Sequence, residues 1–272
     1  MIRSHGLKLK RLKDHRRYSY PRTFGAVAID IPPEGLGIDP PWDEPDQNAE
    51  GYPNGCTGYA QAYEASIENG LRYDPAFIYR KSLEIDNVPD GSPVSFESSL
   101  KAGRVYGLLA EGEKTDSEAL AHRRGQSFEP EMSFIGFQTA MTREFKKGKK
   151  QVISIGSKWY NEWNRTGKDG IAPMADFSQG WTGAGHNYVF SDWKMIYGRP
   201  YMIAHVWQGK NFGDNGKMYF SQEQVDMICK QRGTQANITS KANPADVQMI
   251  QLDIMSLILS KLFIILQKMF GG

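Results

Sequence analysis

The stretch Asn54-Gly55-Cys56-Thr57-Gly58-Tyr59-Ala60 places a cysteine after a turn and before the small residues of a helix start. The chain has one other cysteine, Cys229. The amides of a helix N-terminus lower the pKa of a thiol, and so does a nearby imidazolium. A histidine in a glycine-rich setting, Gly185-His186-Asn187, lies far downstream, and such partners meet in space rather than along the chain. The pattern predicts a nucleophile at Cys56 with His186 as its partner; the alternative is a buried, inert cysteine.

The composition is that of one large globular domain. Of the 272 residues, 40% are hydrophobic and 24% are charged, and the net charge of +2 gives no reason to expect nucleic acid as a partner. Two cysteines do not make a disulfide framework, which favours a reducing compartment, and the basic N-terminus lacks the apolar segment of a secretory signal. The scattered histidines and cysteines show no metal-ligand spacing, and the glycine-rich pieces lack the lysine of a phosphate loop. We therefore expect a cytoplasmic protein without a metal or cofactor.

Hydrophobic periodicity divides the chain into a helical first half and a β-rich second half. After an irregular segment over residues 32–56, we expect a helix from Cys56 to a stop at Gly70, because Ala60, Tyr63 and Ile67 recur at helical spacing. Further helices are expected from Asp74-Pro75 onward and over Ser95–Tyr106. Strands are expected over residues 26–31, 152–156, 187–190, 201–206 and 217–220. This order of elements predicts an α+β domain with two lobes.

The C-terminal region is expected to be separate from that domain. We assign residues 1–229 to the domain, the polar and turn-rich residues 230–245 to a linker, and residues 246–272 to an amphipathic helix. A coiled-coil seam with 3-4-3-4-3 spacing is formed by Leu252, Met255, Leu259, Leu262, Leu266 and Met269. The seam predicts a homo-oligomer or docking into a larger protein assembly. Binding to a membrane surface is the second choice and a membrane span the third, because Lys261 would cost about 2.5–3.5 kcal/mol at a bilayer centre. Packing back onto its own domain is the remaining alternative.

Several segments, taken in order, resemble the papain-like cysteine peptidases, in particular their bacterial and phage branch. The resemblance runs from about Leu9 to about Met227. It rests on an opening motif, a strand, the nucleophile motif, a helix leading into Tyr-Gly, the Gly-His pair and a late glycine turn. These are Lys13–Tyr20, Val27–Asp30, Cys56–Ala60, Phe77–Tyr79 with Gly91–Gly107, Gly185-His186 and Phe212–Gly216.

The resemblance implies a two-lobed fold, a helical lobe beside a β-barrel-like lobe, and a cysteine endopeptidase that works through an acyl-enzyme. Cys56 would be the nucleophile and His186 the acid and base. Gln47, in a motif resembling Asp-Gln-Gly, would donate to the oxyanion, although it stands nine residues before Cys56 and implies an insertion in the loop; Asn54 is the alternative.

The asparagine that orients the catalytic histidine in this family has no direct match. Alignment on Trp207 puts His205 at its position, and a neutral imidazole can accept a hydrogen bond. Alignment on the glycines puts Val206 there instead, whose side chain cannot accept one. We therefore take His205 as the orienting residue expected from the sequence. No pro-segment is expected before the mature-like start.

A second hypothesis belongs to another class of protein. The unmatched asparagine, the displaced Gln47 and the added C-terminal helix also fit a papain fold with reduced or lost catalysis that serves as a structural component of a multi-chain assembly, such as a phage tail. That protein would be virion-associated. A third hypothesis combines the two, with an active peptidase anchored by its C-terminal helix.

Overall fold

The computed structural model describes residues 7–8, 18–19, 29–40, 42–242 and 247–270. Its first half is helical, as predicted, with α2 (Cys56–Asn69), α3 (Pro75–Asp86) and α4 (Phe96–Val105) close to the expected bounds. Local chemistry sets these ends. Asp74 caps α3 through the amide of Ala76, Ser95 caps α4 through the amide of Ser98, and Gly70 ends α2 in the left-handed conformation with φ of 69°.

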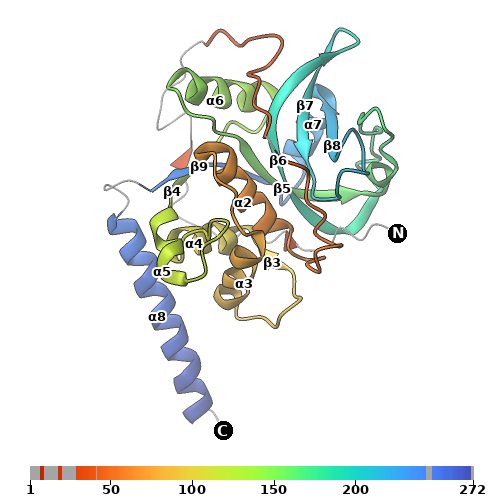
Figure 1. The fold of residues 1–272 in the computed structure, drawn as a ribbon. Coiled ribbons are helices and arrows are strands. Elements are labelled where there is room, and N and C mark those ends of the chain that lie inside the picture. The colour runs from red at the N-terminus through yellow and green to blue at the C-terminus, as the bar shows by residue number, and fades with distance from the viewer. Residues whose placement is uncertain (1–6, 9–17, 20–28, 41, 243–246, 271–272) are drawn as a thin grey trace.

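Helix α2 runs through the centre of the molecule, between the helices α3 and α4 and the sheet (Figure 1). Every residue from Cys56 to Ile67 is buried, which is typical of a core helix and unlike a surface helix with one apolar face. The small residues of the nucleophile motif make this packing possible. A Cβ atom at Gly58 would lie 2.4 Å from the carbonyl oxygen of Pro75 and 2.9 Å from the amide nitrogen of Tyr79, so only glycine lets α3 cross α2 this closely.

The second half forms an antiparallel sheet, the β-rich lobe beside α2 in Figure 1. The long strand β6 (Trp181–Ile196) pairs with β5 (Ile153–Tyr160) on one edge and with β7 (Arg199–His205) on the other, and β7 pairs with β8 (Lys217–Ser221). The strands predicted over 152–156, 187–190, 201–206 and 217–220 are therefore confirmed, although β6 begins well before its predicted start. Together the two halves give the α+β fold expected from the sequence.

Several elements have no counterpart in the predictions because their apolar residues are few and widely spaced. They are α5 (Asp116–Ala119), the 3-10 helix η1 (Leu120–His122), β4 (Arg124–Glu129), α6 (Phe134–Lys146), the 3-10 helix η2 (Asn161–Arg165) and α7 (Gln222–Lys230). Helix α6 was not predicted although it carries apolar residues at helical spacing. Phe134, Phe137 and Met141 are buried in the core, whereas Ile135 and Phe145 are exposed.

The predicted linker over residues 230–245 is wrong in its central part. Residues Gln235–Lys241 form strand β9, which lies between β4 and β5 in the sheet. Ala236 and Ile238 are buried in the core, and the polar Asn237 and Thr239 are buried with hydrogen-bond partners. The domain therefore extends at least to Lys241 rather than ending at residue 229. The turn-rich composition hid a strand whose polar side chains lie inside the protein and bond their neighbours, as Nδ2 of Asn237 bonds the hydroxyl of Thr239.

The C-terminal helix α8 (Val247–Phe270) forms as predicted, and one of its faces packs onto α4. Ile250 and Leu257 are buried there, and Asp253, which is fully buried, accepts a 2.7 Å hydrogen bond from Nε of Arg104. Figure 1 shows the C-terminal half of α8 extending past the helical lobe. Among the described helices it alone is long and apolar enough to cross a membrane by length and composition, over Ile250–Gln267.

Two short strands come from the N-terminal region. β1 (Leu7–Lys8) pairs with β3 (Val94–Ser95) and with β6, and β2 (Tyr18–Ser19) pairs with β4. Most of the opening motif over residues 13–20 lies outside the described residues. Of the predicted strand over 26–31, residues 29–31 are described and are not in a strand.

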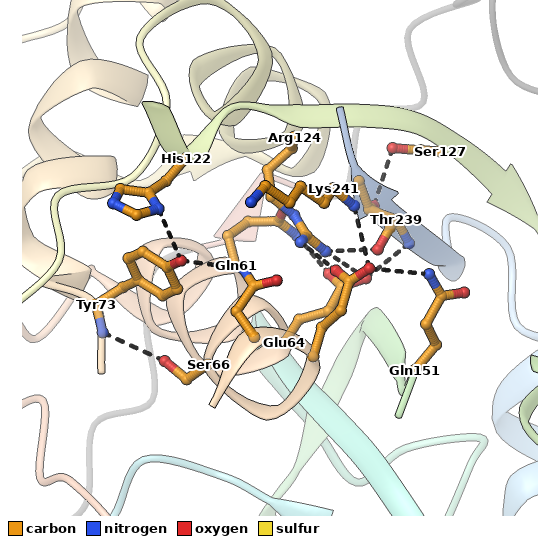
Figure 2. Close-up of polar contacts among 12 residues, drawn as sticks. Gln61, Glu64, Ser66, Tyr73, His122, Arg124, Ser127, Gln151, Thr239 and Lys241 are labelled. Atoms are coloured by element: carbon orange, nitrogen blue, oxygen red, sulfur yellow. Dashed lines mark hydrogen bonds and ion pairs between the residues drawn. The ribbon is translucent and has the colours of Figure 1, made fainter. Parts of the chain in front are cut away.

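A buried ion-pair network ties α2 to the far edge of the sheet (Figure 2). Arg124 on β4 donates to Glu68 of α2 and to the carbonyl oxygen of Thr239 on β9, both at 2.5 Å, and its Nη2 lies 3.6 Å from Glu64. The amide of Thr239 donates to Glu64 at 2.7 Å. Burial raises the pKa of Glu64 to about 8, and Arg124 opposes that shift. Burial also acts to raise the pKa of Glu68, but Arg124 outweighs it and the pKa is lowered.

We predict that Arg124→Ala lowers the free energy of unfolding by about 3–5 kcal/mol, because it leaves buried carboxylates without their counter-charge. Chemical denaturation measures this value. The matched control is Lys210→Ala, which removes an exposed ion pair with Asp43 at 3.9 Å and should change stability by about 0.5 kcal/mol or less. Equal effects of the two substitutions would contradict the role assigned to the network.

Candidate active site

Cys56 is the first residue of α2 and is fully buried. Gly55 occupies the N-cap and brings no side chain to bond the amides of the first turn. The amides of Cys56 and Thr57 therefore act on the thiol and lower its pKa, as expected at the positive end of a helix dipole. The sequence prediction placed Cys56 at such a helix start, and the structure has it there.

His186 lies on β6 and is also fully buried. Its Nε2 lies 2.9 Å from the carbonyl oxygen of Val206. A carbonyl oxygen can only accept, so Nε2 carries the proton and Nδ1 is the basic nitrogen. Nδ1 is buried and has no hydrogen-bond partner among the described residues. The indole of Trp159 packs edge-on against the imidazole, with ring centroids 4.8 Å apart.

The thiol of Cys56 lies against β6, the strand that carries His186. The backbone amide of Asn187, directly after His186, hydrogen-bonds to the thiol of Cys56 and lowers its pKa. Burial has the larger effect and raises the pKa of Cys56 to about 12. Burial likewise lowers the pKa of His186 to about 4, against the hydrogen bond to Val206, which raises it. Both shifts favour the uncharged form, a thiol at Cys56 and a neutral imidazole at His186.

His205 does not orient His186 in this structure. Its Nδ1 is bonded to a carboxylate oxygen of Glu44 and lies 2.7 Å from the hydroxyl of Tyr63, and its Nε2 lies 2.7 Å from the hydroxyl of Ser191. With both ring nitrogens engaged elsewhere, the orienting role expected of His205 is not observed. The acceptor is the main chain of the next residue, Val206. Sequence analysis gave Val206 as an alternative position but excluded it by its side chain, and a main-chain acceptor leaves no signal in residue type.

Gln47 is fully buried in the loop that precedes α2. Its side-chain amide donates to the carbonyl oxygen of Pro53 at 3.1 Å, and its backbone amide donates to the carbonyl oxygen of Trp207 at 3.1 Å. The alternative residue, Asn54, donates instead to the carbonyl oxygen of Gly91 at 2.6 Å. Gln47 is therefore held between the segment before Cys56 and the segment after Val206, whereas Asn54 ties the loop to the helical lobe.

Trp207 contacts both the strand that carries His186 and the helix that begins at Cys56. Its indole Nε1 donates to the carbonyl oxygen of Asn187 at 2.7 Å, so it bonds the strand that carries His186. Its backbone has a φ of 59°, a left-handed conformation that is uncommon for a bulky residue and that turns the chain sharply after Val206. Its ring packs against Tyr63, with centroids 4.9 Å apart.

The N-terminal strand β1 reaches the same region. Leu7 pairs with Gly185, next to His186, in antiparallel register, while β1 pairs with β3 of the helical lobe in parallel register. The last pair between β6 and β7 is Val189 with His205. β1 thus occupies the edge of β6 beyond the point where β7 ends. In the described part of the chain, His, Cys, Asp and Glu form no group of three or more that could hold a metal ion.

Comparison with solved structures reveals clear relatives of this fold. Xylellain, a cysteine protease from Xylella fastidiosa, matches with a TM-score of 0.69 at 14% identity, over 89% of this chain and 97% of its own. A digestive procathepsin L 3 of Tenebrio molitor larval midgut matches with a TM-score of 0.61 at 11% identity, over 88% and 77%. A procathepsin B from Trypanosoma congolense matches with a TM-score of 0.56 at 12% identity, over 84% and 82%. The fold is papain-like.

Sequence comparisons add nothing to this result: no protein-family model and no curated protein matches the chain. The papain-like fold therefore confirms the architecture expected from the resemblance, with the C-terminal helix α8 appended to it. At sequence identities of 11–14%, these matches are evidence for the fold alone. The roles of Val206 and Gln47, where this chain departs from the family pattern, therefore rest on their contacts in this chain.

We predict that iodoacetamide alkylates Cys56 slowly near neutral pH and that the rate rises about tenfold per pH unit into the alkaline range, because only the thiolate reacts and burial raises the thiol pKa. The experiment uses Cys229→Ala, so that the other cysteine does not contribute, and follows the adduct by mass. A fast rate that is constant below about pH 7 would mean that a thiolate–imidazolium pair exists in the free protein, contrary to this prediction.

Proposed function

We propose that this protein is a cysteine endopeptidase that hydrolyses peptide bonds through an acyl-enzyme. One observation carries the proposal: the hydrogen bond from Nε2 of His186 to Val206 leaves Nδ1 basic, and the thiol of Cys56 lies at a helix N-terminus beside Asn187. A nucleophile with a base in a fixed tautomer is the arrangement that covalent acyl transfer requires. The papain-like fold agrees with this proposal, because xylellain, with the same fold, is a cysteine protease.

In the proposed mechanism the thiol proton moves to Nδ1 of His186 and the Cys56 sulfur attacks the peptide carbonyl carbon. The backbone amide of Cys56 and the side-chain amide of Gln47 would donate to the oxyanion, which requires Gln47 to use the N–H that Pro53 does not take. Nδ1 then returns the proton to the leaving amine, and the C–N bond breaks. Water, deprotonated by the same nitrogen, hydrolyses the thioester and frees the sulfur.

The pKa shifts that favour a neutral pair are compatible with this mechanism when substrate binding alters the surroundings of the pair. Burial disfavours both charged forms, and a developing imidazolium needs a partner of opposite charge. The thiolate supplies that charge during the reaction, and the Val206 carbonyl and the amide of Asn187 are already aimed at the two ions. The protein would thus provide fixed dipoles where the charges develop.

We predict that Cys56→Ala abolishes hydrolysis of a fluorogenic peptide library while the circular dichroism spectrum and unfolding midpoint stay close to those of the wild type. The control is Cys229→Ala, which removes the other thiol and should retain full activity. Labelling by an epoxide inhibitor of cysteine peptidases should map to Cys56 by mass and be lost in His186→Ala. Hydrolysis that persists in Cys56→Ala would rule out the proposed mechanism.

We also propose a second role, self-association through α8. The heptad positions described, Leu252, Met255, Leu259, Leu262 and Leu266, are all exposed. The residues that pack on α4 are different ones, Ile250, Asp253 and Leu257. The domain thus leaves free the one face whose spacing suits another helix, which favours a second copy of α8 as the partner. This observation supports the hypothesis of an assembly component, with or without catalysis.

We predict that the wild-type protein is an oligomer by light scattering and that Leu259→Glu with Leu266→Glu makes it a monomer, because charges are expelled from a coiled-coil seam. The matched control, Ser260→Glu with Gln267→Glu, adds the same charges one residue further along the exposed helix and should leave the oligomer intact. A wild type that is monomeric at high concentration would contradict self-association. Co-sedimentation of that monomer with anionic lipid vesicles would assign α8 to a membrane surface instead.

A further inference from the structure

A buried polar cluster outside the Cys56–His186 pair has no part in the mechanism above. Glu44, Tyr63, Ser191 and His205 come from four separate segments and are all buried. His205 bonds Glu44 and lies 2.7 Å from Tyr63 through Nδ1, and it lies 2.7 Å from Ser191 through Nε2. The hydroxyl of Tyr63 donates to the same oxygen of Glu44 at 2.8 Å.

The cluster lies where two functional segments are joined. His205 directly precedes Val206, which holds His186, and Glu44 stands three residues before Gln47. Between these ends the two segments pair through their backbones. Gln47 donates to the carbonyl oxygen of Trp207 at 3.1 Å, Gly209 donates to that of Pro45 at 3.0 Å, and Asp46 forms an antiparallel bridge with Gln208. Because the two segments are antiparallel, Glu44 and His205 flank opposite ends of this short ladder, and the contact between their side chains links the two segments a second time.

Packing around Glu44 leaves it no room to move. A Cβ atom at Gly216, where φ is +90°, would lie 2.3 Å from Cγ of Glu44, so the turn before β8 presses its bare backbone onto this side chain. On the other side, the ring of Tyr63 lies 4.7 Å from that of His205 and 4.9 Å from that of Trp207. The carboxylate is thus held against the imidazole by both packing and hydrogen bonds.

We infer that Glu44 and His205 are positioning residues that set the Val206 carbonyl and the Gln47 amide as one unit. If the pair is broken, the two segments lose the side-chain link that supplements their backbone ladder, and the acceptor of His186 and the proposed oxyanion donor both shift. This inference rests on the proposed peptidase activity for its kinetic consequence, but the geometry of His186 can be measured without any turnover.

The kinetic test compares Glu44→Ala, which removes the carboxylate, with Glu44→Gln, which keeps an oxygen acceptor for Tyr63 and His205. For Glu44→Ala we expect kcat to fall about 10- to 100-fold with little change in KM, because displaced catalytic groups slow the chemical step. Glu44→Gln should recover most of kcat. Glu64→Gln, a buried carboxylate on α2 away from this cluster, controls for loss of stability and should leave kcat unchanged.

The structural test records ¹⁵N chemical shifts of the His186 ring in a Cys56→Ala background at neutral pH. With the pair intact, we expect the Nε2-protonated tautomer alone. With Glu44→Ala added, we expect a mixture of tautomers, and with Glu44→Gln a return to the single form. These shifts do not depend on peptidase activity.

The two tests distinguish failure of the proposed peptidase activity from failure of the positioning role. Inactivity of the wild type together with the expected tautomer shifts would remove the proposed function and leave the positioning role standing. A Glu44→Ala variant that folds, keeps kcat within about twofold and keeps the single tautomer would overturn the inference, because a positioning residue has to move the group that it positions. If Glu44→Ala does not fold, Glu44→Leu, which fills a similar space without an acceptor, takes its place, and a single His186 tautomer in that variant would overturn the inference.

Discussion

The hydrogen bond between the His186 ring and the Val206 carbonyl oxygen makes the chemistry of this site depend on the geometry of its sheet. The acceptor is main chain, so its place is set by the pairing of β6 with β7, whose last matched residues are Val189 and His205. The left-handed backbone of Trp207 then turns the chain back across β6, where the indole bonds Asn187. An error in strand register would therefore disturb the tautomer of His186, the proposed base, as well as the packing of the core.

Burial joins the fold to the ionisation of the site. The core that stabilises the protein surrounds the first turn of α2 on all sides and brings Cys56 and His186 into an environment of low dielectric constant. Such an environment favours neutral groups at rest and strengthens any dipole that is already in place. The same packing that raises the pKa of the thiol would make the amides and the carbonyl around it effective once charge is transferred.

The sequence predicts those parts of the molecule that have local causes. Glycines at 55, 58 and 70, small residues between them and a spaced apolar stripe are enough to place α2 and the thiol at its start. Long-range contacts leave no such trace. The partner of His205 is Glu44, far away along the chain, and the partner of His186 is a backbone atom. β9 was missed for a related reason, since the buried amide and hydroxyl groups of Asn237 and Thr239 have the composition of a loop.

Strand β1 has a consequence for how this protein would meet a peptide. Leu7 pairs with Gly185 at the edge of β6, beside His186, and any extended peptide that added itself to that edge would have to take the place of β1. A tethered segment competes at an effective concentration on the order of millimolar. The apparent affinity for such a peptide is then reduced by the fraction of molecules in which the edge is vacant. Selectivity would come in part from the chain itself, because a weakly bound peptide would lose this competition and a tightly bound one would win it.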